Sequence, residues 1–230
     1  MSNAFYITTP LYYVNAAPHI GHSYTEVAAD CLARYHRLKG EDVFFLTGTD
    51  EHGEKIAQAA QAQGVSPKAF ADRTSQTFRT LWSLLGISYD HFIRTTDPDH
   101  ERIVQEVLTR LEPQLVKGRY AFWYCVPCET SFGLSEIDAV RPHCLNCQRP
   151  VKQVEEEDYF LSLEAHRDWL RRHILAQETF ILPVERRNEI LSLLEHPLPD
   201  LCITRPKDRV LWGISVPFSD NHVTYVWFDA

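Results

Sequence analysis

His19-Ile20-Gly21-His22 joins two segments with different patterns, and this junction decides the fold. Residues 4–15 before it have the composition of a β-strand, broken at Pro10. The apolar residues after it recur at helical spacing until Gly40, which suits a C-terminal cap. A strand that leads into a glycine-containing turn at a helix N-terminus is where α/β proteins bind phosphate, because free N–H groups and the positive end of the helix dipole meet the anion. The tetrapeptide therefore predicts a nucleotide site.

Chance occurrence and helix capping are the alternative explanations of the two histidines. The next strand argues against chance, since residues 42–47 form a short apolar run of the kind that is buried on both faces of a parallel sheet. Strand, helix and strand then make a right-handed crossover, and ligands bind beyond the carboxyl ends of such strands. Residues 48–53, Gly-Thr-Asp-Glu-His-Gly, come directly after the second strand. Two polar clusters are therefore expected to converge on one crevice.

Length and composition indicate an ordinary globular protein. The 230 residues suffice for one large or two modest domains, and 44% hydrophobic with 23% charged residues is typical of soluble chains. No apolar run approaches the roughly 20 residues that cross a bilayer, and no signal segment begins the chain, so we expect a cytoplasmic protein without membrane contact. The net charge of −8 argues against nucleic-acid binding over the whole surface. The acidic run 155–158 is expected to be a solvated face.

Four of the six cysteines form two pairs, Cys125 with Cys128 and Cys144 with Cys147, and fifteen residues separate the pairs. This spacing suits a structural Zn²⁺ site with four sulfur ligands, which has no open position for catalysis. Disulfide bonds are the alternative, but they are uncommon in cytosolic proteins. A redox pair is a further alternative, although both pairs would need a reason to recur.

The pattern along the chain predicts a doubly wound α/β domain with an insertion. Residues 1–115 are expected to form its first half, residues 116–200 a zinc-bearing insertion, and residues 201–230 the start of its second half. Within the insertion, strand-like residues 119–160 precede amphipathic helices near 164–176 and 184–195. The final run, 223–230, is expected to be a buried strand, and Cys31 and Cys202 are expected in the core. So short a second half would leave a sheet edge uncovered, so we expect a truncated chain.

These residues resemble methionyl-tRNA synthetases, class I enzymes whose Rossmann-like nucleotide-binding domain is split by a connective insertion. The resemblance covers essentially the whole chain and rests on residues 8–15, 19–22, 45–53, the four paired cysteines, 203–206 and 225–230. The His-Ile-Gly-His tetrapeptide marks only the wider class, whereas the stretch 47–53 and the cysteine placement indicate the methionine enzyme. The resemblance implies activation of L-methionine by ATP, with Mg²⁺ accompanying the nucleotide, and transfer to methionine tRNA.

The resemblance also implies roles for individual residues. His19 and His22 would be catalytic residues on the triphosphate, Gly21 would lie beside the adenine, and Arg205 would lie near the adenylate. Asp50 would hold the ammonium group of the substrate, and the methionine site as a whole would comprise Leu11, Tyr13, Asp50, Trp227 and Ala230. A pocket of aromatic and aliphatic groups suits a polarisable thioether. Without the family, the two aromatic residues could be core residues, Asp50 a helix cap, and Arg205 half of a surface ion pair.

The sequence departs from the family pattern in two segments that would lie beyond Ala230. The family's Lys-Met-Ser-Lys-Ser loop and its helical anticodon-binding domain are absent from the sequence. We therefore expect the chain alone to activate methionine weakly or not at all, with tRNA bound mainly by regions beyond residue 230. A non-catalytic, zinc-stabilised module that binds RNA or a protein is the alternative, and a class I synthetase for another amino acid is a third. The retention of His19, His22 and Asp50 at converging strand ends favours the enzyme.

Overall fold

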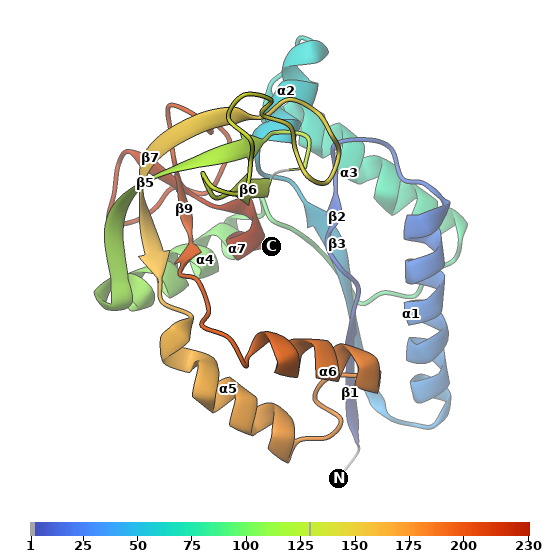
Figure 1. Cartoon of the computed structure of the whole chain (residues 1–230). Coiled ribbons are helices and arrows are strands. Elements are labelled where there is room, and N and C mark those ends of the chain that lie inside the picture. The colour runs from blue at the N-terminus through green and yellow to red at the C-terminus, as the bar shows by residue number, and fades with distance from the viewer. Residues whose placement is uncertain (1–2, 129) are drawn as a thin grey trace.

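The structure, a computed structural model, describes residues 3–128 and 130–230. Its centre is a parallel sheet of β1 (Ala4–Thr8), β2 (Tyr12–Tyr13), β3 (Asp42–Asp50) and β4 (His91–Arg94), in which β3 pairs with each of the other strands (Figure 1). The carboxyl ends of parallel strands meet at one edge of a sheet. At that edge the register places Tyr13 beside Asp50.

Four helices accompany the parallel sheet: α1 (Ile20–Leu38), α2 (Glu54–Ala62), α3 (Pro67–Leu84) and α4 (Pro98–Leu111). A glycine with positive φ lies just beyond each of the first three, with values of 79° at Gly40, 66° at Gly64 and 67° at Gly86. A residue without a Cβ adopts this conformation at little cost and ends a helix. The helix end predicted at Gly40 is therefore confirmed, and Gly64 and Gly86 end their helices in the same way.

The expectation for the apolar side of α1 is wrong. The residues at helical spacing are exposed: Tyr24, Val27, Cys31, Leu32 and Tyr35. The helix instead packs through Ala29 and Ala33 against Phe45 of β3, because small side chains allow close approach to the strand. Phe44 on the other side of β3 is 48% exposed, so residues 42–47 are not buried on both faces. The α/β fold class is unaffected by this correction.

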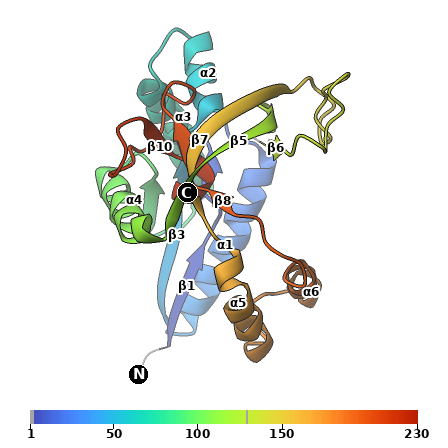
Figure 2. The same ribbon diagram turned by 60° about the vertical axis from the view of Figure 1, so that its left-hand side comes forward.

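The insertion has its own antiparallel sheet in the order β6-β5-β7-β8, built from β5 (Leu115–Cys125), β6 (Thr130–Phe132), β7 (Lys152–Leu161) and β8 (Leu201–Cys202). A short 3₁₀ helix, Glu112–Gln114, leads into β5. Between β7 and β8 the chain forms α5 (Glu164–Ala176) and α6 (Val184–Leu193), a hairpin that lies away from the sheet (Figure 2). The predicted ranges of both helices are confirmed, with α6 ending slightly earlier than expected.

The acidic run on β7 is not a wholly solvated face, as its composition suggested. Side chains alternate between the two faces of a strand, so Glu156 and Asp158 point inward while Glu155 and Glu157 are exposed. Asp158 accepts a hydrogen bond from Thr204 at 2.8 Å. Burial raises the pKa of both inward carboxyl groups.

The last thirty residues form β9 (Thr204–Pro206), its antiparallel partner β10 (His222–Thr224), and α7 (Val226–Asp229). The buried strand expected over 223–230 is therefore wrong after Thr224. The chain turns into a helix there, because the N–H of Phe228 donates to the carbonyl of Tyr225 and that of Ala230 to Val226. Helix α7 lies near the centre of the molecule (Figure 1). Among the described residues, no helix is long and apolar enough to cross a membrane.

Candidate functional site

His19 and His22 cap α1, as the alternative explanation of these residues suggested. Nδ1 of His19 accepts from the N–H of Gly21 at 3.1 Å, and Nδ1 of His22 accepts from the N–H of His19 at 3.1 Å. The two rings stack with their centroids 3.8 Å apart. Since Nδ1 accepts in both, each neutral ring carries its proton on Nε2 and offers that N–H as a donor. Capping therefore leaves two donors at the start of the helix for an anion.

The surroundings of His22 favour its neutral form. Burial, and then the nearby His19, lower the pKa of His22 below the usual value for histidine. The rings of Tyr12 and Phe78 pack against it at centroid distances of 5.1 and 5.3 Å. Gly21 suits this arrangement, since a Cβ there would lie 3.0 Å from Cε1 of His19 and the ring would have to shift. The tetrapeptide thus gives a compact turn with two fixed imidazole donors.

A cavity of about 460 Å³ lies at the carboxyl edge of the parallel sheet. All the residues predicted for the methionine site line it: Leu11, Tyr13, Asp50, Trp227 and Ala230. Pro10, Lys55 and Val226 complete the lining. Trp227 is 69% exposed and therefore not a core aromatic, and the N-cap of α2 is Gly53, so Asp50 does not cap that helix. Residues from three separate parts of the chain thus meet around one mostly apolar cavity.

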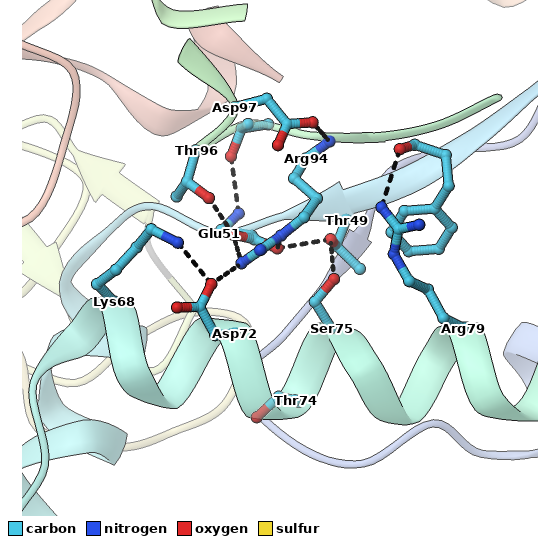
Figure 3. A network of polar contacts seen from close by, with 12 residues as sticks. Thr49, Glu51, Lys68, Asp72, Thr74, Ser75, Arg79, Arg94, Thr96 and Asp97 are labelled. Carbon is cyan, nitrogen blue, oxygen red and sulfur yellow. Dashed lines mark hydrogen bonds and ion pairs between the residues drawn. The ribbon is translucent and has the colours of Figure 1, made fainter.

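Glu51, next to Asp50, anchors this end of β3 through a buried polar network (Figure 3). Its carboxylate accepts from Nε and an Nη of Arg94, both at 2.7 Å, and from the hydroxyls of Thr49 at 2.7 Å and Thr96 at 2.5 Å. Burial by itself raises the pKa of Glu51, but these hydrogen bonds outweigh it and the pKa is lowered. A fully bonded carboxylate holds the backbone beside Asp50 in one position.

A second buried pair joins the end of β3 to α7. Nδ1 of His52 lies 2.9 Å from a carboxylate oxygen of Asp229, and the two side chains are 3% and 1% exposed. The indole N–H of Trp212 donates to the Glu51 carbonyl at 2.5 Å, and the N–H of Gly53 donates back to the Trp212 carbonyl at 3.0 Å. No sequence motif indicated these contacts. They fix α7, and with it two walls of the cavity, against β3.

Arg205 is buried, so the alternative of a surface ion pair is wrong. Its side chain is 6% exposed, donates to the Thr204 carbonyl at 2.6 Å, and lies 3.8 Å from the ring centroid of Tyr225. It lines a small neighbouring cavity that shares Val226 with the larger one. Among the described residues, Arg205 is therefore close to the site without lining the cavity around Asp50.

The four paired cysteines meet at the far end of the β5–β7 ladder, and their Sγ atoms all lie within 4.8 Å of one another. The distances are 3.6 Å between Cys125 and Cys147 and 3.8 Å between Cys128 and Cys144. A tetrahedral zinc with bonds of about 2.3 Å needs sulfur atoms about 3.8 Å apart, whereas a disulfide needs about 2 Å. The four sulfurs therefore fit a tetrahedral metal ion and are not disulfide-bonded.

Backbone N–H groups donate to the sulfur of Cys144, the first residue of the second cysteine pair. Burial alone raises the pKa of Cys144, but N–H groups of Cys147 and Asn146 lower it to about 7. Burial raises the pKa of Cys125, and a hydrogen bond with Cys147 raises that of Cys128, so Cys144 is the cysteine of the cluster whose thiolate the protein favours. The thiolate is the metal-binding form of cysteine.

The two cysteines outside the cluster were expected in the core, and neither is fully buried: Cys31 is exposed and Cys202 is only half-buried.

A larger hollow of about 830 Å³ lies between β7 and residues 206–222. Charged side chains of both signs line most of it. Small-molecule sites are usually apolar with a few placed polar groups. The smaller cavity around Asp50 has that character and is the stronger candidate.

Comparisons with known proteins agree on one family. The family profile described as "tRNA synthetases class I (M)" matches residues 5–154 and 133–230. A methionine–tRNA ligase of Caldanaerobacter subterraneus subsp. tengcongensis is 49% identical over 100% of this chain, and one of Thermotoga maritima is 49% identical over 98%. The chain spans 36% of the length of each of these curated relatives.

Solved structures of a Mycobacterium tuberculosis methionyl-tRNA synthetase have the same fold. The complex with methionyl-adenylate superposes with a TM-score of 0.91 at 43% identity, covering 99% of this chain and 45% of that one. The free state superposes with a TM-score of 0.79 at 38% identity, covering 100% of this chain and 44% of that one. The chain is therefore more similar in structure to the complex than to the free state.

Proposed function

Because this chain belongs to the methionyl-tRNA synthetases of class I, we propose that it carries the methionine site and part of the ATP site of an ATP-dependent methionine–tRNA ligase. The observation that carries the proposal is the cavity beside β3, whose lining contains every residue that the resemblance implies for methionine. Its apolar walls suit the thioether, and Asp50 suits the ammonium group. The substrate would be L-methionine, with ATP and a methionine tRNA as the other partners.

The reaction consists of two transfers. An oxygen of the methionine carboxylate attacks the α-phosphorus of ATP, the bond to the bridging oxygen breaks, and pyrophosphate leaves. A terminal ribose hydroxyl of the tRNA then attacks the activated carbonyl, and AMP leaves. Positioning and charge stabilisation supply most of the rate in such reactions. The Nε2–H groups of His19 and His22, at the N-terminus of α1, would stabilise the charge that develops on the leaving pyrophosphate.

Zn²⁺ would be held by Cys125, Cys128, Cys144 and Cys147, whose sulfur spacing suits it. With four sulfur ligands the metal would stabilise the loop and leave no position for water. Mg²⁺ would accompany ATP. Residues 1–115 and 201–230 would form parts of the catalytic domain and residues 116–200 the insertion, although β8 extends the insertion's sheet to Cys202. Translation in the cytoplasm would be the setting.

The experiment that tests this function is calorimetric titration of the chain with L-methionine and with a non-hydrolysable methionyl-adenylate analogue. We expect both to bind and the analogue to displace methionine, with leucine and isoleucine much weaker. Asp50→Asn should weaken methionine by about tenfold or more, since it removes a charged hydrogen bond. Asp42→Asn, at the exposed other end of β3, is the matched control and should have no effect.

Two outcomes would contradict the proposal. Binding of neither ligand would favour a zinc-stabilised module that binds RNA or a protein. Stronger binding of leucine or isoleucine than of methionine would favour a synthetase for another amino acid.

A further inference from the structure

Lys55 lies in the wall of the candidate methionine cavity, and no sequence motif assigned it a role. Of the described residues that line this cavity, Asp50 is the anion and Lys55 the cation. Lys55 is half-buried, and its ammonium nitrogen lies 5.6 Å from the ring centroid of Tyr13. The cavity therefore has one charge of each sign in an otherwise mainly apolar wall.

The position of Lys55 in α2 favours a negative charge at this side of the cavity. Lys55 is the second residue of the helix, where the dipole is positive and where acidic residues are preferred. The N-cap is Gly53, which has no side chain to accept the first N–H groups of the helix. Glu54, the first residue of the helix, is acidic, but it lines the neighbouring small cavity and not this one, so Lys55 supplies the positive side chain of this wall.

A free amino acid needs such a pair of charges. At neutral pH its ammonium and carboxylate groups are both ionised and lie on the same carbon atom, so each requires a partner when the molecule is buried. Asp50 can take the ammonium group, and the apolar walls can take the side chain. The carboxylate then needs a cation on the same cavity.

We propose that Lys55 binds the α-carboxylate of the amino acid substrate while Asp50 binds its ammonium group. This inference rests on the proposed function, because it assigns a further residue to the same site. Lys55 would hold the carboxylate in place before the attack on ATP, and one carboxylate oxygen could remain on the lysine while the other forms the new bond. The basic side chains of Arg94 and His52, at the same end of β3, do not line the cavity, whereas Lys55 does.

The experiment measures calorimetric affinities for two ligands, L-methionine and L-methioninol, in which a neutral alcohol replaces the carboxylate. We expect Lys55→Met to weaken methionine by about 10- to 100-fold, as a lost charged hydrogen bond predicts, and to leave methioninol unweakened. Lys55→Arg should retain more of the methionine affinity than Lys55→Met does. Asp50→Asn should weaken both ligands, since both carry the ammonium group.

Lys39→Met is the matched control, because it removes a lysine that pairs with Glu41 beyond the end of α1, and it should change neither affinity. Circular dichroism melting checks that each variant folds. Equal weakening of both ligands by Lys55→Met, or no weakening of methionine, would overturn the role of Lys55 while leaving the proposed function standing. Failure of the unmodified chain to bind either ligand would instead overturn the proposed function, and the role of Lys55 with it.

Discussion

Asp229 and His52 are 177 positions apart in the sequence, yet their side chains are in hydrogen-bond contact inside the protein. Asp229 lies in the same short helix as Trp227 and directly before Ala230, both of which line the cavity. Both side chains are almost fully buried, so water cannot replace either one as the hydrogen-bond partner of the other. At the scale of single residues, this pair connects the stability of the fold to the shape of the candidate site.

Asp229→Ala should lower the free energy of unfolding by about 1–3 kcal/mol, because it leaves His52 with a buried ring nitrogen that has lost its partner. Urea denaturation followed by fluorescence measures the change. Asp99→Ala, whose side chain is 95% exposed, is the control and should have little effect. Equal stability of the Asp229 and Asp99 variants would show that the buried pair contributes nothing.

Glu26 predicts a pH dependence of stability. Burial raises its pKa, although the hydroxyls of Tyr12 and Thr47 donate to it and lower the pKa in part. The neighbouring Asp30 raises it slightly further. Because the folded protein favours the protonated form, this contribution to stability is complete below the pKa of the unfolded chain, near 4.5, and is lost as the pH rises through the raised value.

Glu26→Gln should therefore stabilise the protein at pH 7 relative to the unmodified chain, with the difference shrinking towards pH 4. The substitution keeps the shape of the side chain and an oxygen that can accept from Tyr12. Thermal denaturation at several pH values measures the difference. A difference that is constant with pH, or that grows in acid, would contradict a raised pKa for Glu26.

The sequence was sufficient to predict which residues meet where a local motif or the resemblance marks them, and insufficient where a residue depends on a distant partner. The cysteine pairs and the two histidines of the α1 turn were found from their spacing. The residues around Asp50 were found because the resemblance covers several separate motifs. Arg94, which holds Glu51, and Asp229, which holds His52, carry no local signal that identifies their partners.

At the scale of elements, the two cysteine pairs make the most direct prediction. Cys125→Ser should reduce bound zinc from one ion per chain to well below one and lower the melting temperature, because three sulfurs no longer enclose the metal. Metal content is measured by mass spectrometry after dialysis. Cys31→Ser, at an exposed cysteine on α1, is the control and should keep the metal. Melting that is unchanged when the metal is lost would contradict a structural role.

Helix positions were predicted more accurately than helix orientations. The range of α5 and the end of α1 before Gly40 agree with the predictions, but the apolar spacing on α1 does not state which side of the helix faces the sheet. Ala29 and Ala33 are the residues of α1 that pack against the sheet, and the larger apolar residues of the helix point away from it. The preference of aromatic and β-branched residues for strands also gave a wrong prediction at the end of the chain. Val226, Trp227 and Phe228 were expected in a strand, but they form the helical turn α7.

At the scale of the whole molecule, contacts between the insertion and the final segment hold separate parts of the chain together. Arg209 forms an ion pair with Glu156 of β7 and lies 4.7 Å from the ring centroid of Tyr124 on β5. The two charged side chains are 12% and 5% exposed. The alternating α and β pattern of the sequence predicted a domain with an insertion. It did not predict the ion pair between Arg209 and Glu156, because the acidic run 155–158 was expected to be a solvated face.

Arg209→Met should lower the free energy of unfolding by about 3–5 kcal/mol, since it leaves the Glu156 carboxylate buried without its cation. Chemical denaturation measures the change. Arg119→Met is the control on the same sheet: its partner Glu155 is adjacent to Glu156, but that pair is 70% and 63% exposed and should contribute little. Similar effects of the two substitutions would show that burial of the Arg209 pair is not decisive.

The position of Ala230 in the cavity wall has a practical consequence for handling the protein. Any peptide, dye or surface anchor joined directly after Ala230 would start at the rim of the cavity and could obstruct it. Strand β1 begins at the opposite edge of the parallel sheet from Asp50, as the strand directions in Figure 1 show. Purification tags and immobilisation chemistry are therefore better placed ahead of β1, where they leave the cavity open to ligands.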